Sequence, residues 1–410
     1  MKQGDVERII RTLSSDEMQG RAIFSPGIEK AATFIESEFK EIGLMPLTGQ
    51  KDFRQEFSLL SISPANYRAT VNDAVIESKN LLFITDKTSL NWDQGSEAEI
   101  HFIKDGEAFM TRYKEIMALK KPVVVFVDEQ FLDAFNRMRS YFMSERVVDK
   151  PDDQKAAAFI LGDNDEIKNY QISFTNKVER SPLFNVAGII PGKTRPNEYV
   201  IFSGHYDHLG IIEAADGDSI ANGADDDATG ITAVISLAKY YKKLNNNART
   251  LIFAAFTGEE SGMLGSKYFS NQLNPTEVVA MFNIEMIGKE SKFGKNAAFI
   301  TGFDRSDFGS ILQKNLAGTG FTFHPDPYTQ QNLFYRSDNA TLAALGVPAH
   351  TISTDQIDND KFYHTVNDEY ETLNVENIAS TISAIALSSR GIVAGTETPR
   401  RIPPLETKKP

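Results

Sequence analysis

The feature that most constrains this chain is the repeated order of short apolar run, loop and amphipathic segment from residue 183 onward. The apolar runs contain few polar residues, which is typical of strands that are buried on both faces of a mainly parallel sheet. The expected strands are residues 198–204, 250–256, 279–285, 297–302 and 349–353. This alternation predicts an α/β fold with a mixed, mainly parallel central sheet sandwiched by helices, and with ligands bound beyond the carboxyl ends of the strands.

Helices are expected between and around these strands. Residues 229–244 carry apolar side chains at three- and four-residue steps, the pattern of a helix with one buried face. Residues 374–393 are expected to form a second long helix. A third is predicted near the N-terminus, where Ser25 and Pro26 are suited to begin a helix and Gly43 to end it.

Residues 61–182 differ in residue pattern from the rest of the chain. Short strand-like runs alternate there with charged stretches, and no group of potential catalytic side chains stands out. We interpret this segment as an inserted β-rich module. The main domain then consists of residues 1–60 and 183–400, and residues 401–410 form a C-terminal tail.

The bulk composition excludes several classes of function. A formal net charge of -13 argues against nucleic acid as a partner, because phosphate binding requires clustered Lys and Arg. The chain contains no cysteine, so any metal must be bound by histidines and carboxylates. No run approaches the roughly 20 apolar residues of a membrane span, and the first ten residues, MKQGDVERII, lack the apolar stretch of a signal peptide. The oligomeric state is left open.

Candidate metal ligands lie at or just beyond the ends of the predicted strands. His205 follows the first strand, and Asp207, two residues further on, could accept a hydrogen bond from its ring. Asp225 lies in the glycine-bounded loop NGADDDATG. Three adjacent carboxylates in such a loop repel one another, and a divalent cation is the simplest counter-charge.

Further candidates follow the next strands. Glu259 and Glu260 come directly after the second strand, Glu285 ends the third, and His364 lies in a polar loop before the last helix. One of two adjacent glutamates can bind a metal while its neighbour takes a proton from metal-bound water. A carboxylate at the end of so apolar a strand is costly to bury unless it is paired or bound to a metal.

Taken singly, each candidate also has a structural explanation, such as a local hydrogen bond to a loop histidine, helix capping, or the favourable position of acids at a helix N-terminus. Taken together, they predict a pair of zinc ions with a carboxylate base, because a doubly wound sheet gathers such loops at one edge. A site of this kind activates water for attack on a carbonyl or phosphoryl group. The other histidines beyond residue 200 lack comparable acidic company in the sequence: His208, His324 and His350.

These motifs resemble those of the M28 family of co-catalytic zinc peptidases, which includes bacterial leucyl-type aminopeptidases. The matching motifs are SGHYDHLG at His205, GADDDATG at Asp225, GEESG at Glu259 and Glu260, NIEMIG at Glu285, YRSDN at Asp338 and FYHT at His364. The resemblance covers residues 1–60 and 183–400. It is faint in 61–182, where many relatives carry a protease-associated insert.

The resemblance implies a set of metal ligands. Asp225 would bridge two zinc ions, with His205 and Glu285 completing one site and Glu260 and His364 completing the other. Most aminopeptidases of the family have Asp at the position of Glu285. The longer side chain leaves open whether one zinc ion or two are bound.

The resemblance also implies roles for other residues. Glu259 would act as the general base and acid, Asp207 would orient His205, and Asp338 is a candidate for substrate binding. A cis peptide bond is expected after Asp225. The family's S-D-H sequence is S-D-N in this chain, ending at Asn339.

The function implied by the resemblance is a zinc-dependent aminopeptidase that removes N-terminal residues from peptides. The alternatives are a glutaminyl cyclase, a two-metal carboxypeptidase or deacylase, and an inactive receptor-like member. The cyclases line their pocket with tryptophan, whereas the only tryptophan of this chain, Trp92, lies in the inserted module. The resemblance favours a periplasmic or secreted location.

Overall fold

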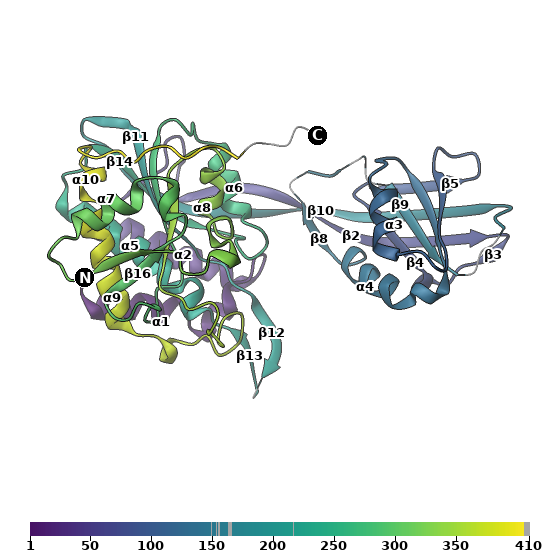
Figure 1. Ribbon diagram of the computed structural model, residues 1–410, viewed down its shortest axis with the longest axis horizontal. Coiled ribbons are helices and arrows are strands. Elements are labelled where there is room, and N and C mark those ends of the chain that lie inside the picture. The colour runs from purple at the N-terminus through teal and green to yellow at the C-terminus, as the bar shows by residue number, and fades with distance from the viewer. Residues whose placement is uncertain (149, 153, 155, 163–165, 216, 406–410) are drawn as a thin grey trace. The chain divides into compact units, whose positions relative to one another are not determined.

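The computed structural model describes residues 1–148, 150–152, 154, 156–162, 166–215 and 217–405. The chain forms two compact units, one made of Met1–Phe57 and the chain from Leu183 onward, the other of Ser58–Pro182 (Figure 1). The predicted divisions are after residues 60 and 182. Of the predicted C-terminal tail, residues 406–410 lie outside the described part of the chain.

The first unit is built on a mixed sheet with strand order β17-β16-β18-β15-β11-β14-β10. Its strands are β10 (Tyr170–Ile190, in part), β11 (Arg195–His205), β14 (Arg249–Phe256), β15 (Val278–Ile284), β16 (Ala297–Ile300), β17 (Thr322–Pro325) and β18 (Ala349–Ser353). The central neighbours β14, β11, β15 and β18 run parallel to one another. β10 and β16 are antiparallel to their inner neighbours, so the predicted mixed, mainly parallel sheet is confirmed. Short β1 (Met45–Pro46) pairs with β10, and β12 (Gly210–Ala215) pairs with β13 (Asp218–Ala221) in a separate hairpin.

Helices cover both faces of this sheet. On one face α1 (Gln3–Leu13), α2 (Pro26–Ile42), α5 (Thr229–Leu244), α7 (Phe308–Asn315), α9 (Val375–Ser388) and α10 (Arg390–Val393) share a hydrophobic core with Val200 and Phe202 of β11. On the other face α6 (Leu264–Asn271) and α8 (Asn339–Ala343) pack with Ile201. Successive residues of a strand point to opposite faces, which explains why such runs are apolar at nearly every position. None of the helices that the structure describes combines the length and apolar character required to cross a bilayer.

The predicted helix boundaries are largely confirmed. The Ser25 hydroxyl accepts a hydrogen bond from the Ile28 amide at the start of α2, and Gly43 ends the helix with a φ of 79°. α5 occupies the predicted residues 229–244. The long helix predicted at 374–393 is two helices, which are separated at Ser389.

The second unit has its own four-stranded sheet, with order β4-β9-β7-β6. Its elements are β3 (Ala74–Val75), β4 (Leu81–Thr85), β5 (Ser89–Asp93), β6 (Glu99–Ile103), α3 (Phe109–Met117), β7 (Val123–Val127), α4 (Leu132–Phe142), β8 (Arg146–Val148) and β9 (Ala156–Leu161), with the outer parts of β2 (Arg54–Val71) and β10. Trp92 is buried there, in the core formed with Phe83 and Phe174.

The order of the central strands determines where the candidate residues meet. β11 ends at His205, β14 ends three residues before Glu259, and β15 ends at the residue before Glu285. These three strands are parallel neighbours. Their carboxyl ends therefore lie side by side at one edge of the sheet.

The aromatic centre of the first unit provides a test of this core. The Phe202 ring is fully buried and stacks on Phe253 and Phe282, with centroids 5.5 and 4.9 Å away. We expect Phe202→Ala to lower the free energy of unfolding by about 3–5 kcal/mol, as is usual for a large cavity in a core. A denaturant titration followed by circular dichroism measures the loss. Phe293→Ala, at a ring that is 41% exposed, is the matched control, and equal losses for the two variants would contradict this packing.

Candidate metal centre

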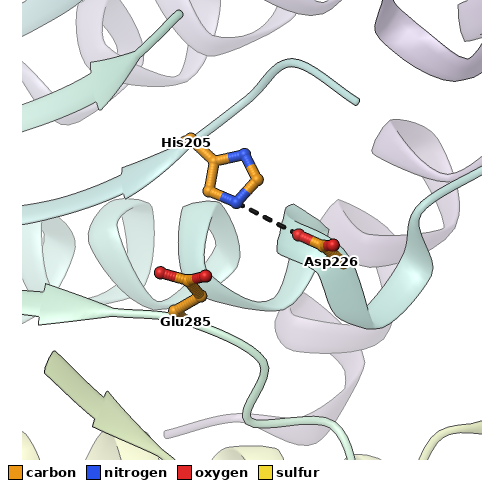
Figure 2. A group of neighbouring side chains, drawn as sticks. All are labelled: His205, Asp226 and Glu285. Carbon is orange, nitrogen blue, oxygen red and sulfur yellow. Dashed lines mark ion pairs between the residues drawn. The ribbon is translucent and has the colours of Figure 1, made fainter. Parts of the chain in front are cut away.

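The site is centred on Asp226, in the turn that precedes α5. Figure 2 shows the carboxylate of Asp226 facing the ring of His205, with Glu285 beside them. The His205 Nε2 lies 3.1 Å from Asp226 Oδ1. The three side chains can each offer one ligand atom within 4.8 Å of the others. This group combines an imidazole with two carboxylates, which is a donor set suited to zinc.

The structure corrects the prediction at Asp225. Its carboxylate faces away from the histidines: Oδ1 accepts a hydrogen bond from the Gly288 amide at 2.7 Å, and Oδ2 lies 3.4 Å from the Lys289 ammonium. The Asp368 carboxylate accepts hydrogen bonds from the amides of Asp225 and Asp226, both at 3.0 Å. This anchoring fixes which of the three consecutive carboxylates turns to the site. The sequence alone could not show which of the three side chains this would be.

The cis peptide bond is also displaced by one residue from its predicted position. It joins Asp226 to Asp227. Asp227 points back into the fold, where its carboxylate accepts hydrogen bonds from the amides of His205 (3.1 Å), Gly230 (3.0 Å) and Met286 (3.2 Å). It therefore ties the acidic loop to the ends of β11 and β15.

A second group of ligands meets on the other side of Asp226. His364 Nε2 lies 3.1 Å from Glu260 Oε2 and 3.3 Å from Asp226 Oδ2. His208 Nδ1 lies 3.0 Å from Glu260 Oε1. The prediction that His208 has no comparable carboxylate neighbours is therefore wrong. Its partner comes from a different loop, which no local sequence pattern could reveal.

Asp207 and Glu259 lie beside this cluster. The Asp207 carboxylate accepts hydrogen bonds from the amides of Glu259 (3.1 Å) and Glu260 (3.4 Å). The ring Nδ1 of His205 lies 3.1 Å from the main-chain oxygen of Asp207 and 3.8 Å from its carboxylate. The contact that orients His205 is therefore made by the backbone of Asp207, while its side chain holds the turn that carries both glutamates.

The donor set fits a bound cation. The Nε2 atoms of His205, His208 and His364 are buried and form no hydrogen bond with the residues that the structure describes. Two of them nonetheless face carboxylate oxygens at 3.1–3.3 Å. Nitrogen and oxygen atoms that converge without hydrogen-bond geometry are suited to share a metal ion.

The electrostatics of the cluster point the same way. Burial raises the pKa of Glu285 to about 7 and raises the pKa of Glu259 well above its usual range. For Asp226, burial is outweighed by His205 and His364, which hold its pKa well below the usual range. Burial is likewise outweighed at His364, where Asp226 and Glu260 raise the pKa to about 10. The pocket gathers several buried carboxylates, which imidazoles balance in part, so a divalent cation would relieve the remaining negative charge.

Arg21 holds the backbone around the site. Its guanidinium is fully buried and donates hydrogen bonds to the main-chain oxygens of Tyr206 (2.8 Å), Leu13 (2.7 Å), Asn222 (2.5 Å) and Gly223 (3.0 Å). It therefore joins the end of β11 to the acidic loop. Five fixed donors make arginine suited to this role, and a lysine would leave several of these oxygens without a partner.

The remaining predicted residues, Asn339 and Asp338, are both fully buried. Asn339 donates to the main-chain oxygens of Phe334 and Ala349 and accepts from the Thr351 hydroxyl. Asp338 is fully buried, and burial raises its pKa to about 6.

A cavity of about 60 Å³ adjoins Glu285. Its walls include Met286, Phe299, Leu333 and Tyr363, and Arg336 lies at the same cavity. Mostly apolar walls with a few polar groups are typical of a site for a small organic group.

The comparisons with known proteins agree with this arrangement. Residues 185–388 match the family described as "Peptidase family M28". A probable zinc metalloprotease of Leptosphaeria maculans is 33% identical over 111 residues, which are 27% of this chain and 25% of that protein. One from Pyrenophora teres f. teres is 30% identical over 129 residues, or 31% of this chain and 26% of that protein. The matched region thus spans about a quarter of the length of these curated relatives.

Solved structures share the fold over nearly the whole chain. The aminopeptidase from Aneurinibacillus sp. strain AM-1 has a TM-score of 0.56 and 18% identity, covering 100% of this chain and 96% of that chain. BSAP, a zinc aminopeptidase from Bacillus subtilis, has a TM-score of 0.57 and 16% identity, covering 96% of this chain and 95% of that chain. The predicted fold class is confirmed, and the chain belongs to peptidase family M28.

His350 and His324 lie outside the cluster. His350 is buried, with Nδ1 2.8 Å from the Thr301 main-chain oxygen and Nε2 2.8 Å from the Ser306 hydroxyl. The His324 ring stacks on Phe293.

The environment of His350 predicts a pH effect on stability. Burial lowers the pKa of His350 from 6.5 to about 4. The stability that neutral His350 provides is therefore fully present above pH 6.5 and is lost as the pH falls towards 4. The expected loss is up to about 3 kcal/mol, because one pKa unit corresponds to about 1.4 kcal/mol. The slope of unfolding free energy against pH gives the number of protons that the protein takes up on unfolding. In His350→Gln this number should fall by up to one between pH 4 and 6.5, and an unchanged slope would contradict the prediction.

Proposed function

We propose that this protein is a zinc-dependent aminopeptidase that hydrolyses N-terminal residues from peptides. The observation that carries the proposal is the position of Asp226, whose two carboxylate oxygens face His205 on one side and His364 on the other, at 3.1 and 3.3 Å. A carboxylate with a histidine on each side is suited to bridge two metal ions. The family match and the fold shared with zinc aminopeptidases support the proposal.

We assign the ligands as two sets that share Asp226. His205 and Glu285 complete the first set, and Glu260 and His364 complete the second. His208 can also offer a ligand atom within 4.8 Å of those of Asp226 and Glu260. When bound, a zinc pair supplies Lewis acidity, which polarises the scissile carbonyl and makes water acidic enough to attack at neutral pH. Glu285 is longer than aspartate, and Ser337 and Asn283 donate hydrogen bonds to its Oε2, which hold it in place.

Glu259 is the proposed proton carrier. Its amide is anchored on Asp207, so its backbone is fixed beside the ligand Glu260. Burial raises the pKa of its carboxyl group, which makes its carboxylate a stronger proton acceptor. Its carboxylate would take a proton from the attacking water and return it to the nitrogen of the leaving amine.

The cavity beside Glu285 would receive the side chain of the terminal residue. Most of its wall is apolar, which favours an uncharged side chain, and Arg336 and Asp355 also line the cavity. A glutaminyl cyclase would line its pocket with tryptophan. The only tryptophan of this chain, Trp92, is buried in the core of the second unit.

Replacement of Glu259 tests the proposal directly. We expect Glu259→Gln to lower kcat for leucyl-p-nitroanilide by about 10²–10⁴-fold, the usual contribution of general acid–base catalysis. Zinc content, measured by elemental analysis, should stay unchanged. Glu41→Gln, at an exposed glutamate of the same unit, is the matched control.

Metal removal and substrate choice complete the test. Dialysis against a zinc chelator should abolish hydrolysis, and added zinc should restore it. An N-acetylated leucyl anilide should not be cleaved, because an aminopeptidase requires the free amine. Near-normal turnover by Glu259→Gln, or equal cleavage of the acetylated substrate, would contradict the proposal.

A further inference from the structure

Glu260, like Asp226, meets a separate imidazole at each of its two carboxylate oxygens. His208 Nδ1 lies 3.0 Å from Oε1, and His364 Nε2 lies 3.1 Å from Oε2. His364 also approaches Asp226 Oδ2 at 3.3 Å, within reach of a shared ion. His208 Nδ1 is 3.8 Å from that same oxygen, too far for a hydrogen bond. The two histidines therefore have different relations to the site.

The ring of His208 is fixed from several sides. Its side chain has no exposed surface, and its amide donates a hydrogen bond to the main-chain oxygen of Arg21. Gly223 packs directly on the ring, since a Cβ atom there would lie 2.6 Å from the ring carbons. The ring also meets His364 edge-on, with centroids 5.9 Å apart. By contrast, the side chain of His364 is 35% exposed.

The proton on the His208 ring can be assigned from its partners. Nδ1 forms the ring's hydrogen bond with Glu260, whereas Nε2 has no partner among the described residues. A carboxylate only accepts hydrogen bonds, so a proton on Nδ1 forms a charge-assisted bond, and a proton on Nε2 would leave two lone pairs facing each other. His208 thus donates from Nδ1 to Oε1.

We propose that His208 is a positioning residue for the second set of metal ligands, holding Glu260 so that Oε2 faces Asp226 and His364. This inference rests on the proposed function, because it assigns a role within the same metal centre. Ligating carboxylates are usually held by a hydrogen bond to the oxygen that does not bind the metal, and such partners affect metal affinity strongly. The backbone of His208 is held by the main-chain oxygen of Arg21, and its ring packs against Gly223.

Two substitutions separate positioning from packing. In His208→Asn the side-chain amide lies near the position of Nδ1 and can still donate to Glu260, whereas His208→Ala removes the donor. Competition with a chromophoric chelator measures the affinities of both zinc ions. We expect His208→Ala to lower the affinity for one of the two zinc ions by about 10–100-fold and to leave the affinity for the other nearly unchanged. His208→Asn should retain most of the affinity, and His324→Ala, distant from the cluster, is the matched control.

X-ray absorption at the zinc edge tests the alternative that His208 is itself a ligand. The number of imidazole ligands per chain should be the same in wild type, His208→Asn and His208→Ala. Loss of one imidazole in both variants, or unchanged affinities in His208→Ala, would overturn the positioning role alone. Failure of the wild-type protein to bind zinc would overturn this role and the proposed function together. Unfolding curves of the metal-free variants show whether they are folded.

Discussion

The main physical constraint on this structure is that several carboxylates are buried together at the carboxyl ends of the parallel strands. Burial alone favours the protonated form of such groups, and the raised pKa values of Glu259 and Glu285 show this. The fold compensates with positive groups placed among them. Arg21 lies behind the acidic loop, Lys289 lies between Asp225 and Asp360, and imidazoles face Asp226. A bound metal pair would complete this balance.

The three consecutive aspartates show how one loop serves three purposes. Asp225 binds Lys289 and the Gly288 amide, Asp226 faces the histidines, and Asp227 accepts hydrogen bonds from amides of neighbouring strands. Asp368 anchors the backbone of the first two. Only Asp226 faces the side chains of the other proposed metal ligands. The other two, together with Arg21, fix its direction, which is what a metal site with defined geometry requires.

Much of the fold could be predicted from residue pattern. The apolar run that became β14 is buried at every position, and the stripe of α5 gave its bounds, because burial in a sandwiched sheet imposes strong periodicity. The break at Ser389 was missed, since apolar spacing continues across it. Within the site, His205, Glu260 and Glu285 follow directly from their positions at strand ends. The structure turns Asp226 rather than the predicted Asp225 towards the histidines, and it gives His208 an acidic partner that the sequence did not indicate, because both contacts depend on residues that are remote in sequence.

The sequence by itself determined the α/β class, the strands whose ends meet, the absence of thiolate ligands and the kinds of side chain available for a metal. Tertiary structure decided which aspartate faces the histidines and which imidazole meets each oxygen of Glu260. The physical reason is that strand and helix periodicity is a local property of the chain, whereas the direction of a side chain in an irregular loop is set by hydrogen bonds from elsewhere. Here those bonds come from Asp368 and Arg21, at opposite ends of the chain.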